Sequence, residues 1–352
     1  MMKNITLFLF VLLTSLFVQS QQPYYTGIDF SLNEQELYDQ LQDLVSIHVT
    51  SFNYGDARDI LVYTDENHEN INTVLLIYGY NDNDGNCTTD RSRSKNDFGG
   101  NSCQYNREHI FPRSLSVPDM GNANNSATGI VADPHNLRAS DQQMNNNRGD
   151  KKFRSGSGSA GPVGSGAWYP GDEWKGDVAR MIMYMYLRYG EQCLPEYVGE
   201  GIKQGNTEML QLFLTWNSQD PVSQVEDQRN EFLESVYGNR NPFIDNPFLA
   251  TKIWGGTPAE DRWNLHTVSF QNNKTVVYPN PALQNYIYVD FSQMEENIEK
   301  ISLIDTQGKT VLSFKHISNS TPHYKIENIP SGFYFVNINT TENTFFHKLI
   351  VK

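Results

Sequence analysis

The chain has 352 residues, of which 38% are hydrophobic and 12% aromatic, and its formal net charge is −14 at pH 7. This length and apolar content predict a folded chain with a buried core and room for more than one domain. Because the overall charge is negative, the chain as a whole does not attract polyanions, so any such ligand must be bound by local basic residues.

The first twenty residues have the pattern of a secretory signal peptide. Lys3 supplies a positive charge, 5–18 is an apolar run, and Val18-Gln19-Ser20 ends in a small residue suited to cleavage. A membrane anchor is the alternative, but the run is short for a span. We expect export, removal of 1–20, and no integral membrane span in the mature chain.

The next segment predicts a helix and two strands. Ser31 and Glu34 have the spacing of a capping box, followed by apolar residues at helical intervals. The runs 60–64 and 73–78 are rich in β-branched and aromatic residues, which predicts strands. The polar stretch 79–103 predicts an exposed loop.

Two of the three cysteines bracket this loop. A disulfide between Cys87 and Cys103 would restrict the loop in the unfolded chain, although two free thiols are equally compatible with the spacing. Cys193 follows a helical stretch and is expected to be a buried thiol rather than a nucleophile.

A central unit follows, with Asn-Arg-Glu-His-Ile-Phe-Pro-Arg-Ser at 106–114 and Asp-Pro-His-Asn-Leu-Arg-Ala-Ser-Asp at 133–141. The first run predicts an extended segment that ends near Pro112. We expect a loop over 117–128, a returning strand at 130–132, and a helix from 133 to about 145 that an Asp-Pro pair opens.

The residue types in this unit suit hydrolysis of a phosphodiester with one divalent metal. His109, whose ordinary pKa is about 6.5, can take a proton from the attacking water. Glu108 and Asn136 offer the oxygen ligands that Mg²⁺ prefers, and the metal would polarise the phosphoryl oxygens. Arg113 and Arg148 can clamp the phosphate.

Plainer alternatives exist for these residues. Neighbours on a regular strand point to opposite faces, so the Glu-His pair shares a pocket only where the strand ends or bulges. His135 is expected to be structural. Asn145 and Arg148 share a helix face, but a frayed helix end with a solvated arginine is an equal alternative. The spacing of cysteines and histidines disfavours a zinc site.

These motifs resemble those of the secreted bacterial endonuclease I family, whose active site is a His-Me finger (ββα-metal) motif. The Asn-Asn-Asn-Arg-Gly run at 145–149 also matches, and the resemblance covers most of 30–255. Further matches lie at 174–180, 216–217, 220–222 and 238–245. A Ser/Gly-rich insert at 155–166 departs from the family pattern.

The resemblance implies a role for each site residue. His109 would be the general base, with Glu108 and Asn136 as ligands of Mg²⁺, or of Ca²⁺ or Mn²⁺ in its place. It implies cleavage of DNA, and also RNA, with little sequence preference and with 5′-phosphate products. The remaining candidates are Arg113 and Arg148 as catalytic residues and Arg107, Arg138 and Asn145 as substrate contacts.

Apolar residues at helical spacing predict core helices at 177–189, 210–214 and 232–237. Basic residues in this region are candidates either for a cleft that contacts phosphates without reading sequence or for a solvated face. They are Lys175, Arg180, Arg188, Arg229 and Arg240.

From residue 276 onward, short alternating runs separated by turns predict a small antiparallel sandwich. The motifs at 277–281, 305–309, 332–334 and 348–352 resemble the C-terminal sorting domain of type IX secretion substrates, which implies the type IX machinery as a partner. A carbohydrate- or surface-binding sandwich is the alternative. The predicted strands are 286–291, 300–304, 310–314, 332–339 and 345–351.

The expected fold class is α+β. A mostly helical nuclease domain around a ββα-metal core would span 21–262, followed by a linker at 263–274 and an all-β sandwich at 275–352. We expect a monomer that is secreted or held at the cell surface. The alternative function is a non-catalytic surface module that binds nucleic acid or glycan.

Overall fold

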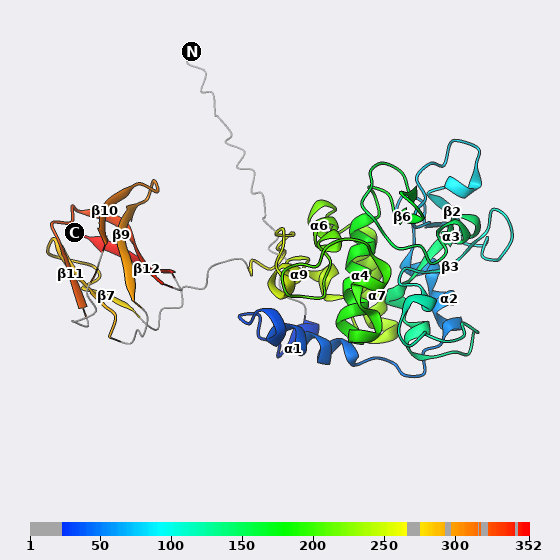
Figure 1. Cartoon of the computed structure of the whole chain (residues 1–352), viewed down its shortest axis with the longest axis horizontal. Coiled ribbons are helices and arrows are strands. Elements are labelled where there is room, and N and C mark those ends of the chain that lie inside the picture. The colour runs from blue at the N-terminus through cyan, green and yellow to red at the C-terminus, as the bar shows by residue number, and fades with distance from the viewer. Residues whose placement is uncertain (1–22, 266–274, 293–296, 316, 318–322, 342–343) are drawn as a thin grey trace, which may run out of the picture. The chain divides into compact units, whose positions relative to one another are not determined.

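The computed structural model describes residues 23–265, 275–292, 297–315, 317, 323–341 and 344–352. The predicted signal peptide at 1–20 lies outside these residues, as does most of the predicted linker. The chain divides into two compact units, Met1–His266 and Thr267–Lys352 (Figure 1). Within the described ranges, no helix combines the length and the apolar character that a membrane crossing requires.

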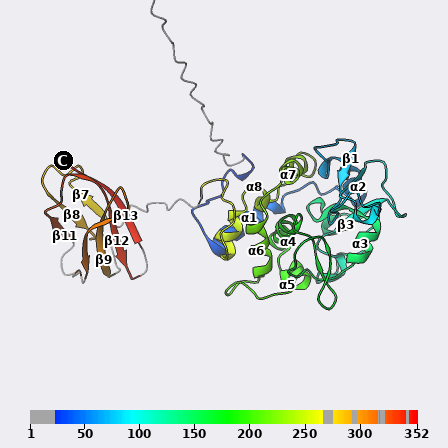
Figure 2. The same cartoon turned by 90° about the horizontal axis from the view of Figure 1, so that it is seen from above.

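The helix α4 (Lys175–Tyr189) is the centre of the N-terminal unit. Almost every side chain along it is buried, because its methionines and tyrosines meet neighbouring helices on all sides. It packs against α1 (Glu34–Ser46), α6 (Gln211–Gln219) and α8 (Pro242–Asp245), as Figure 2 shows from above. The predicted helix at 177–189 is therefore confirmed.

The other helices described in this unit are shorter than α4. The predicted helices at 210–214 and 232–237 are confirmed as parts of α6 and α7. Both views place α2 and α3 at one end of the unit and α1 and α9 at the other (Figures 1 and 2). The bounds are α2 (Tyr54–Thr64), α3 (Gln142–Arg148), α5 (Pro195–Val198), α7 (Gln224–Tyr237) and α9 (Phe248–Trp254).

Two predictions near the start of the chain are wrong. Residues 60–64 form the end of α2 and not a strand, because Asn53 opens this helix with a capping box that it shares with Asp56. The capping box predicted at Ser31 does not form. Ser31 bonds to Asp29 instead, and α1 begins at Glu34 without a side-chain cap.

Small strand pairs complete the N-terminal unit. The predicted strand at 73–78 is shortened to β1 (Thr73–Leu75), which pairs with β2 (Ser92–Ser94). The Ser/Gly-rich insert contributes β5 (Gly161–Val163), which forms a hairpin with β6 (Ala167–Tyr169).

The four arginines of the helical region are buried and paired with carboxylates, so they form neither a cleft nor a solvated face. Lys175 also has a carboxylate partner, but its pair with the exposed Asp172 lies at the surface. The pairs of Arg180, Arg188 and Arg229 join residues that are distant in sequence. The pairs are Lys175–Asp172 at 3.7 Å, Arg180–Glu226 at 2.6 Å, Arg188–Asp133 at 2.9 Å, Arg229–Asp65 at 3.1 Å and Arg240–Asp245 at 2.5 Å.

The described part of the C-terminal unit is all-β. Two antiparallel sheets, with strand orders β10-β9-β12-β13 and β11-β8-β7, enclose one core built from alternating residues such as Ile287, Leu303 and Val336. The five predicted strands are confirmed as β8, β9, β10, β12 and β13; β7 and β11 were not predicted. The bounds are β7 (Val276–Tyr278), β8 (Tyr286–Asp290), β9 (Ile298–Asp305), β10 (Thr310–Lys315), β11 (His323–Glu327), β12 (Gly332–Thr340) and β13 (Thr344–Val351).

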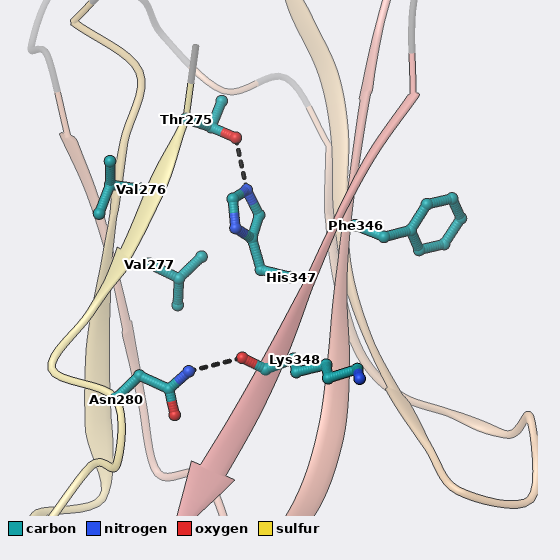
Figure 3. Close-up of a pocket in the computed structure, with 7 residues that line it drawn as sticks. All are labelled: Thr275, Val276, Val277, Asn280, Phe346, His347 and Lys348. Carbon is teal, nitrogen blue, oxygen red and sulfur yellow. Dashed lines mark hydrogen bonds between the residues drawn. The ribbon is translucent and has the colours of Figure 1, made fainter. Parts of the chain in front are cut away.

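A cavity of about 500 Å³ lies between β7 and β13, each an outer strand of its sheet (Figure 3). His347 points across it and its Nε2 lies 2.5 Å from the Thr275 hydroxyl. Asn280 donates to the Lys348 carbonyl at 2.6 Å and accepts from the Ile350 N–H at 3.0 Å. Its side-chain amide thus bonds to the edge of β13 as a neighbouring strand would.

Candidate active site

A strand pair and a helix organise the candidate site. β3 (Tyr105–His109) pairs antiparallel with β4 (Leu137–Asp141), which places Glu108 opposite Arg138. Asp141 ends β4 and begins α3, because its carboxylate accepts the Gln143 and Met144 N–H groups at 2.8 and 2.9 Å. The order is strand, loop, strand, helix.

The predicted bounds inside this unit are wrong although the order is right. Residues 130–132 belong to a 3-10 helix (Gly129–Ala132) and not to the returning strand. Asp133 does accept the N–H of His135, but it caps only a 3-10 turn, Pro134–Asn136, before β4 begins. The sequence does not indicate β4 because its residues are mostly polar. They are buried by ion pairs and hydrogen bonds and not by apolar contacts, so they leave no hydrophobic periodicity.

His109 is held on one face of β3. Its Nε2 lies 2.9 Å from the carbonyl oxygen of Val131, and its ring stacks on Tyr54 with centroids 5.4 Å apart at 16°. A carbonyl oxygen can only accept, so Nε2 carries the proton and Nδ1 keeps its lone pair. His109 is therefore placed to act as a base through Nδ1.

Burial lowers the pKa of His109 to about 4. The contact with Val131 opposes this shift, whereas the positive charges of Arg113, Arg107 and Arg148 add to it. The imidazole is consequently neutral at pH 7, the form that a general base requires. The same three arginines make its surroundings favourable for an anion.

Glu108 lies on the other face of β3, with different partners. Its Oε1 accepts from the Tyr78 hydroxyl at 3.2 Å and lies 3.2 Å from Nη1 of Arg148. Burial raises the pKa of Glu108 to about 7, and Arg148 and Tyr78 limit that rise. The strand ends at His109, so the two neighbouring side chains reach the site from opposite faces at a strand terminus.

Tyr78 is a site residue that the sequence did not indicate. It is fully buried, and its backbone has φ of 73°, a left-handed conformation that costs a bulky residue on the order of 1–3 kcal/mol. In this strained conformation the Tyr78 hydroxyl contacts Glu108. The β-branched and aromatic run at 73–78 predicts a strand that includes Tyr78, and the positive φ of Tyr78 is what distinguishes it from a strand residue.

Arg148 is buried at the strand end and is not a solvated charge at a frayed helix end. It donates to the carbonyls of His109 at 3.1 Å and Ile110 at 2.9 Å, and its guanidinium lies 4.6 Å from the Phe153 ring centroid. These contacts fix the backbone that carries both candidate catalytic residues.

Two predicted site residues are engaged elsewhere. The amide of Asn136 bonds at both ends to the backbone of Phe111, accepting its N–H at 2.7 Å and donating to its carbonyl at 3.0 Å. Arg138 is fully buried between Asp65 and Asp177. Both side chains are thus used to hold the fold together.

Asn145, Arg107 and Arg113 lie around the site. The side-chain amide of Asn145 donates to Asn106 at 2.7 Å and to the carbonyl of Arg107 at 3.2 Å, and within the described ranges no hydrogen bond involves its side-chain oxygen. The Arg107 guanidinium lies 3.5 Å from the Tyr54 ring centroid. Arg113 is partly exposed and donates to the carbonyl of Gly121 at 2.6 Å.

The predicted disulfide between Cys87 and Cys103 is confirmed, with a Cα–Cα distance of 5.4 Å. Arg93 connects its loop to the site, because it donates to the Cys87 carbonyl and to Asp141 at 2.6 Å. Cys193 is a buried free thiol whose pKa is raised by burial, which disfavours a nucleophilic role.

The family models match most of the chain. The model of Endonuclease I matches residues 34–248, and that of the secretion system C-terminal sorting domain matches 276–352. Two curated relatives are named extracellular ribonuclease. That of Bacillus subtilis is 37% identical over 66% of this chain and 78% of its own; that of Bacillus amyloliquefaciens is 39% identical over 61% and 72%.

The N-terminal unit is therefore a nuclease domain, and a secretion sorting domain follows it in the chain. The chain belongs to the endonuclease I family, and it is a secreted enzyme whose sorting domain implies export by type IX secretion. Among solved structures, the sulfur carrier protein SoxY of Chlorobium limicola aligns with 23% of this chain and 80% of its own at 12% identity and a TM-score of 0.17, too low to support a conclusion about the fold.

Proposed function

We propose that the chain is a metal-dependent endonuclease that hydrolyses DNA and RNA with little sequence preference and leaves 5′-phosphates. In this proposal β3, β4 and α3 form a His-Me finger. The observation that carries it is the neutral His109, whose Nε2 is bonded to Val131 and whose Nδ1 is free to accept a proton. The name of both relatives, extracellular ribonuclease, supports RNA as a substrate.

His109 acts as the general base in this mechanism. Its Nδ1 takes a proton from the water that attacks phosphorus, and its Nε2–H stays on the Val131 carbonyl, which stabilises the imidazolium as it forms. Arg148 holds the carbonyls of His109 and Ile110, so the base keeps its place at the strand end.

The donor set fits a hard divalent cation such as Mg²⁺. Among the described residues, no cluster of three or more histidine, cysteine or carboxylate side chains could hold a metal, which disfavours zinc. Glu108 offers a carboxylate and Asn145 an amide oxygen without a donor, and Mg²⁺ needs few protein ligands because it keeps several waters. When bound, the metal would neutralise charge on the phosphoryl oxygens.

Asn145 replaces Asn136 as the proposed amide ligand. The Asn136 oxygen already accepts the Phe111 N–H at 2.7 Å, and the side chain is fully buried. A metal at that oxygen would have to displace a backbone hydrogen bond, which leaves a buried donor unsatisfied.

Arginines without a carboxylate partner supply the phosphate contacts. Within the described chain, the buried arginines of the helical region are paired with carboxylates. Arg107 and Arg113, in contrast, bond only to neutral oxygens there. The net charge of −14 thus does not prevent phosphate binding at this site.

The test is cleavage of plasmid DNA and of RNA by the secreted chain, with Mg²⁺, with EDTA and with His109→Ala. We expect cleavage that EDTA abolishes and that His109→Ala lowers by about 10²–10⁴-fold. His135→Ala is the matched control, because His135 is also buried with Nε2 on a backbone carbonyl, that of Asn239 at 3.2 Å. A folded wild type that binds nucleic acid but cleaves none would favour the non-catalytic module.

A further inference from the structure

Tyr54, the first residue of α2, packs its ring against two side chains of β3. Arg107 and His109 are two apart on the strand and therefore share a face, about 6.7 Å from one another. The Arg107 guanidinium lies over the Tyr54 ring, 3.5 Å from its centroid, and the His109 imidazole stacks on the same ring with centroids 5.4 Å apart.

We propose that Tyr54 is a positioning residue for His109, which it holds in the orientation that directs Nδ1 to the reacting phosphate. This inference rests on the proposed role of His109 as the base. Tyr54 itself touches neither substrate nor metal, and it affects the proton transfer through the imidazole.

One hydrogen bond does not fix an imidazole. The contact of Nε2 with Val131 leaves the ring free to rotate about that bond, and the rotation would swing Nδ1 away from the site. A flat surface against the ring face removes this freedom, and Tyr54 supplies it at an interplanar angle of 16°. A displacement of about 1 Å in a catalytic group can cost on the order of a hundredfold in rate.

Tyr54 is itself held from several directions. Its N–H donates to the Ala127 carbonyl at 2.8 Å, and its own carbonyl accepts from Arg107. The capping box of Asn53 fixes the start of the helix that carries it. The side chain is only 6% exposed, so the ring cannot move away from His109 without disturbing α2.

The aromatic ring of Tyr54, and not its hydroxyl, orients His109. No hydrogen bond from the Tyr54 hydroxyl occurs among the residues that the structure describes, whereas its ring contacts both His109 and Arg107. Because Tyr54 is only 6% exposed, a nucleobase has little of its ring on which to stack, which disfavours a role as a base platform.

The experiment compares Tyr54→Phe and Tyr54→Leu in the full chain, with kcat and KM measured on a short fluorogenic oligonucleotide. We expect Tyr54→Leu to lower kcat by about tenfold to a hundredfold and Tyr54→Phe to restore kcat, whereas a change in KM reports the lost contact of the ring with Arg107. A folded Tyr54→Leu with kcat unchanged, or a Tyr54→Phe as impaired as Tyr54→Leu, would overturn the proposal.

Phe52→Ala is the control for a general loss of packing. Phe52 belongs to the same small cluster as Tyr54 and is 7% exposed, but its ring contact is with Tyr237 at 5.0 Å and not with His109. We expect Phe52→Ala to lower stability and to leave kcat of the folded enzyme unchanged. If Phe52→Ala lost as much kcat as Tyr54→Leu, the loss would come from disturbed packing in general, and the proposal would be overturned.

NMR of the His109 ring separates this inference from the proposed function. In the wild type, the ring current of Tyr54 should shift the imidazole proton signals of His109, which are assigned by their loss in His109→Ala. The shift should persist in Tyr54→Phe and disappear in Tyr54→Leu. An unshifted signal in the wild type overturns the stack whatever the activity, whereas a shifted signal in a chain that cleaves nothing refutes only the nuclease mechanism.

Discussion

Glu108 and Arg148 form an ion pair of 3.2 Å in which the two side chains are 4% and 0% exposed. A carboxylate this deeply buried would ordinarily be protonated, and burial indeed raises its pKa to about 7 even with the arginine beside it. A divalent cation would stabilise the ionised form further. The Glu108 carboxyl is thus close to the midpoint of its titration at neutral pH.

Metal affinity should therefore depend on pH. Because the pKa of Glu108 is raised to about 7, its protonated share grows as the pH falls through 7, and the apparent affinity for Mg²⁺ should drop by up to about tenfold per pH unit below that value. His109, with its pKa lowered to about 4, stays neutral over the same range. Calorimetric titration with Mg²⁺ between pH 5.5 and 8 measures this. An affinity that does not change over this range contradicts the assignment of Glu108.

The choice between the two asparagines can be decided by metal binding. We expect Asn145→Ala to weaken Mg²⁺ binding by on the order of tenfold or more, because it removes a ligand oxygen. Asn136→Ala should leave the affinity of the folded protein unchanged and lower its stability by about 1–3 kcal/mol, since two backbone groups of Phe111 lose their partner. The reverse result would restore Asn136 as the ligand.

Arg138 should matter for stability and not for substrate. Replacement by Ala removes the cation that lies between Asp65 and Asp177. Asp65 keeps Arg229 at 3.1 Å, and among the described residues Asp177 keeps only Arg180 at 3.9 Å, so we expect the free energy of unfolding to fall by about 3 kcal/mol. All five tryptophans lie between residues 168 and 263, so their fluorescence during urea unfolding reports on the N-terminal unit alone.

Arg113→Ala provides the contrast. This side chain is partly exposed, and among the described residues its hydrogen bond is to Gly121 alone, so we expect little change in stability. If it contacts one phosphate, the slope of log kcat/KM against log salt should fall by about 0.7–0.9. An unchanged slope would remove Arg113 from the substrate contacts.

The disulfide should stabilise the loop before β3. Its cysteines are 16 residues apart, so the Cys87→Ser, Cys103→Ser double variant should lose about 2–3 kcal/mol of unfolding free energy. Specific activity at low temperature should be retained, because Arg93 still links the loop to Asp141. Urea unfolding and the activity of the folded fraction measure the two effects separately, and an equal loss of both would show that the disulfide shapes the site itself.

Local sequence patterns predicted much of this molecule. The apolar spacing in 177–189 and the alternation in 332–339 correspond to α4 and β12, because a single periodicity decides which face is buried. The motif around Glu108 and His109 also named the two residues on which the proposed mechanism depends. The disulfide between Cys87 and Cys103 was one of two alternatives that the sequence left open, and the structure contains it.

The errors arose where a long-range partner decides the structure. β4 was missed because Arg138 is buried by Asp65, which lies 73 residues away in the chain. Arg180 and Arg229 were placed at the surface because their carboxylate partners come from other helices or loops. Tyr78, 30 residues from Glu108, gives no signal of its contact with that carboxylate.

The sequence by itself determined the family, the export route, the chemical types in the site and most of the regular elements, since these depend on local motifs and periodicities. The tertiary structure alone decided which charges are internal, which backbone groups the amide of Asn136 bonds, and that Tyr54 and Tyr78 contact His109 and Glu108. The physical reason is that burial and pairing set the charge state and orientation of a side chain, and both are made by residues distant in sequence.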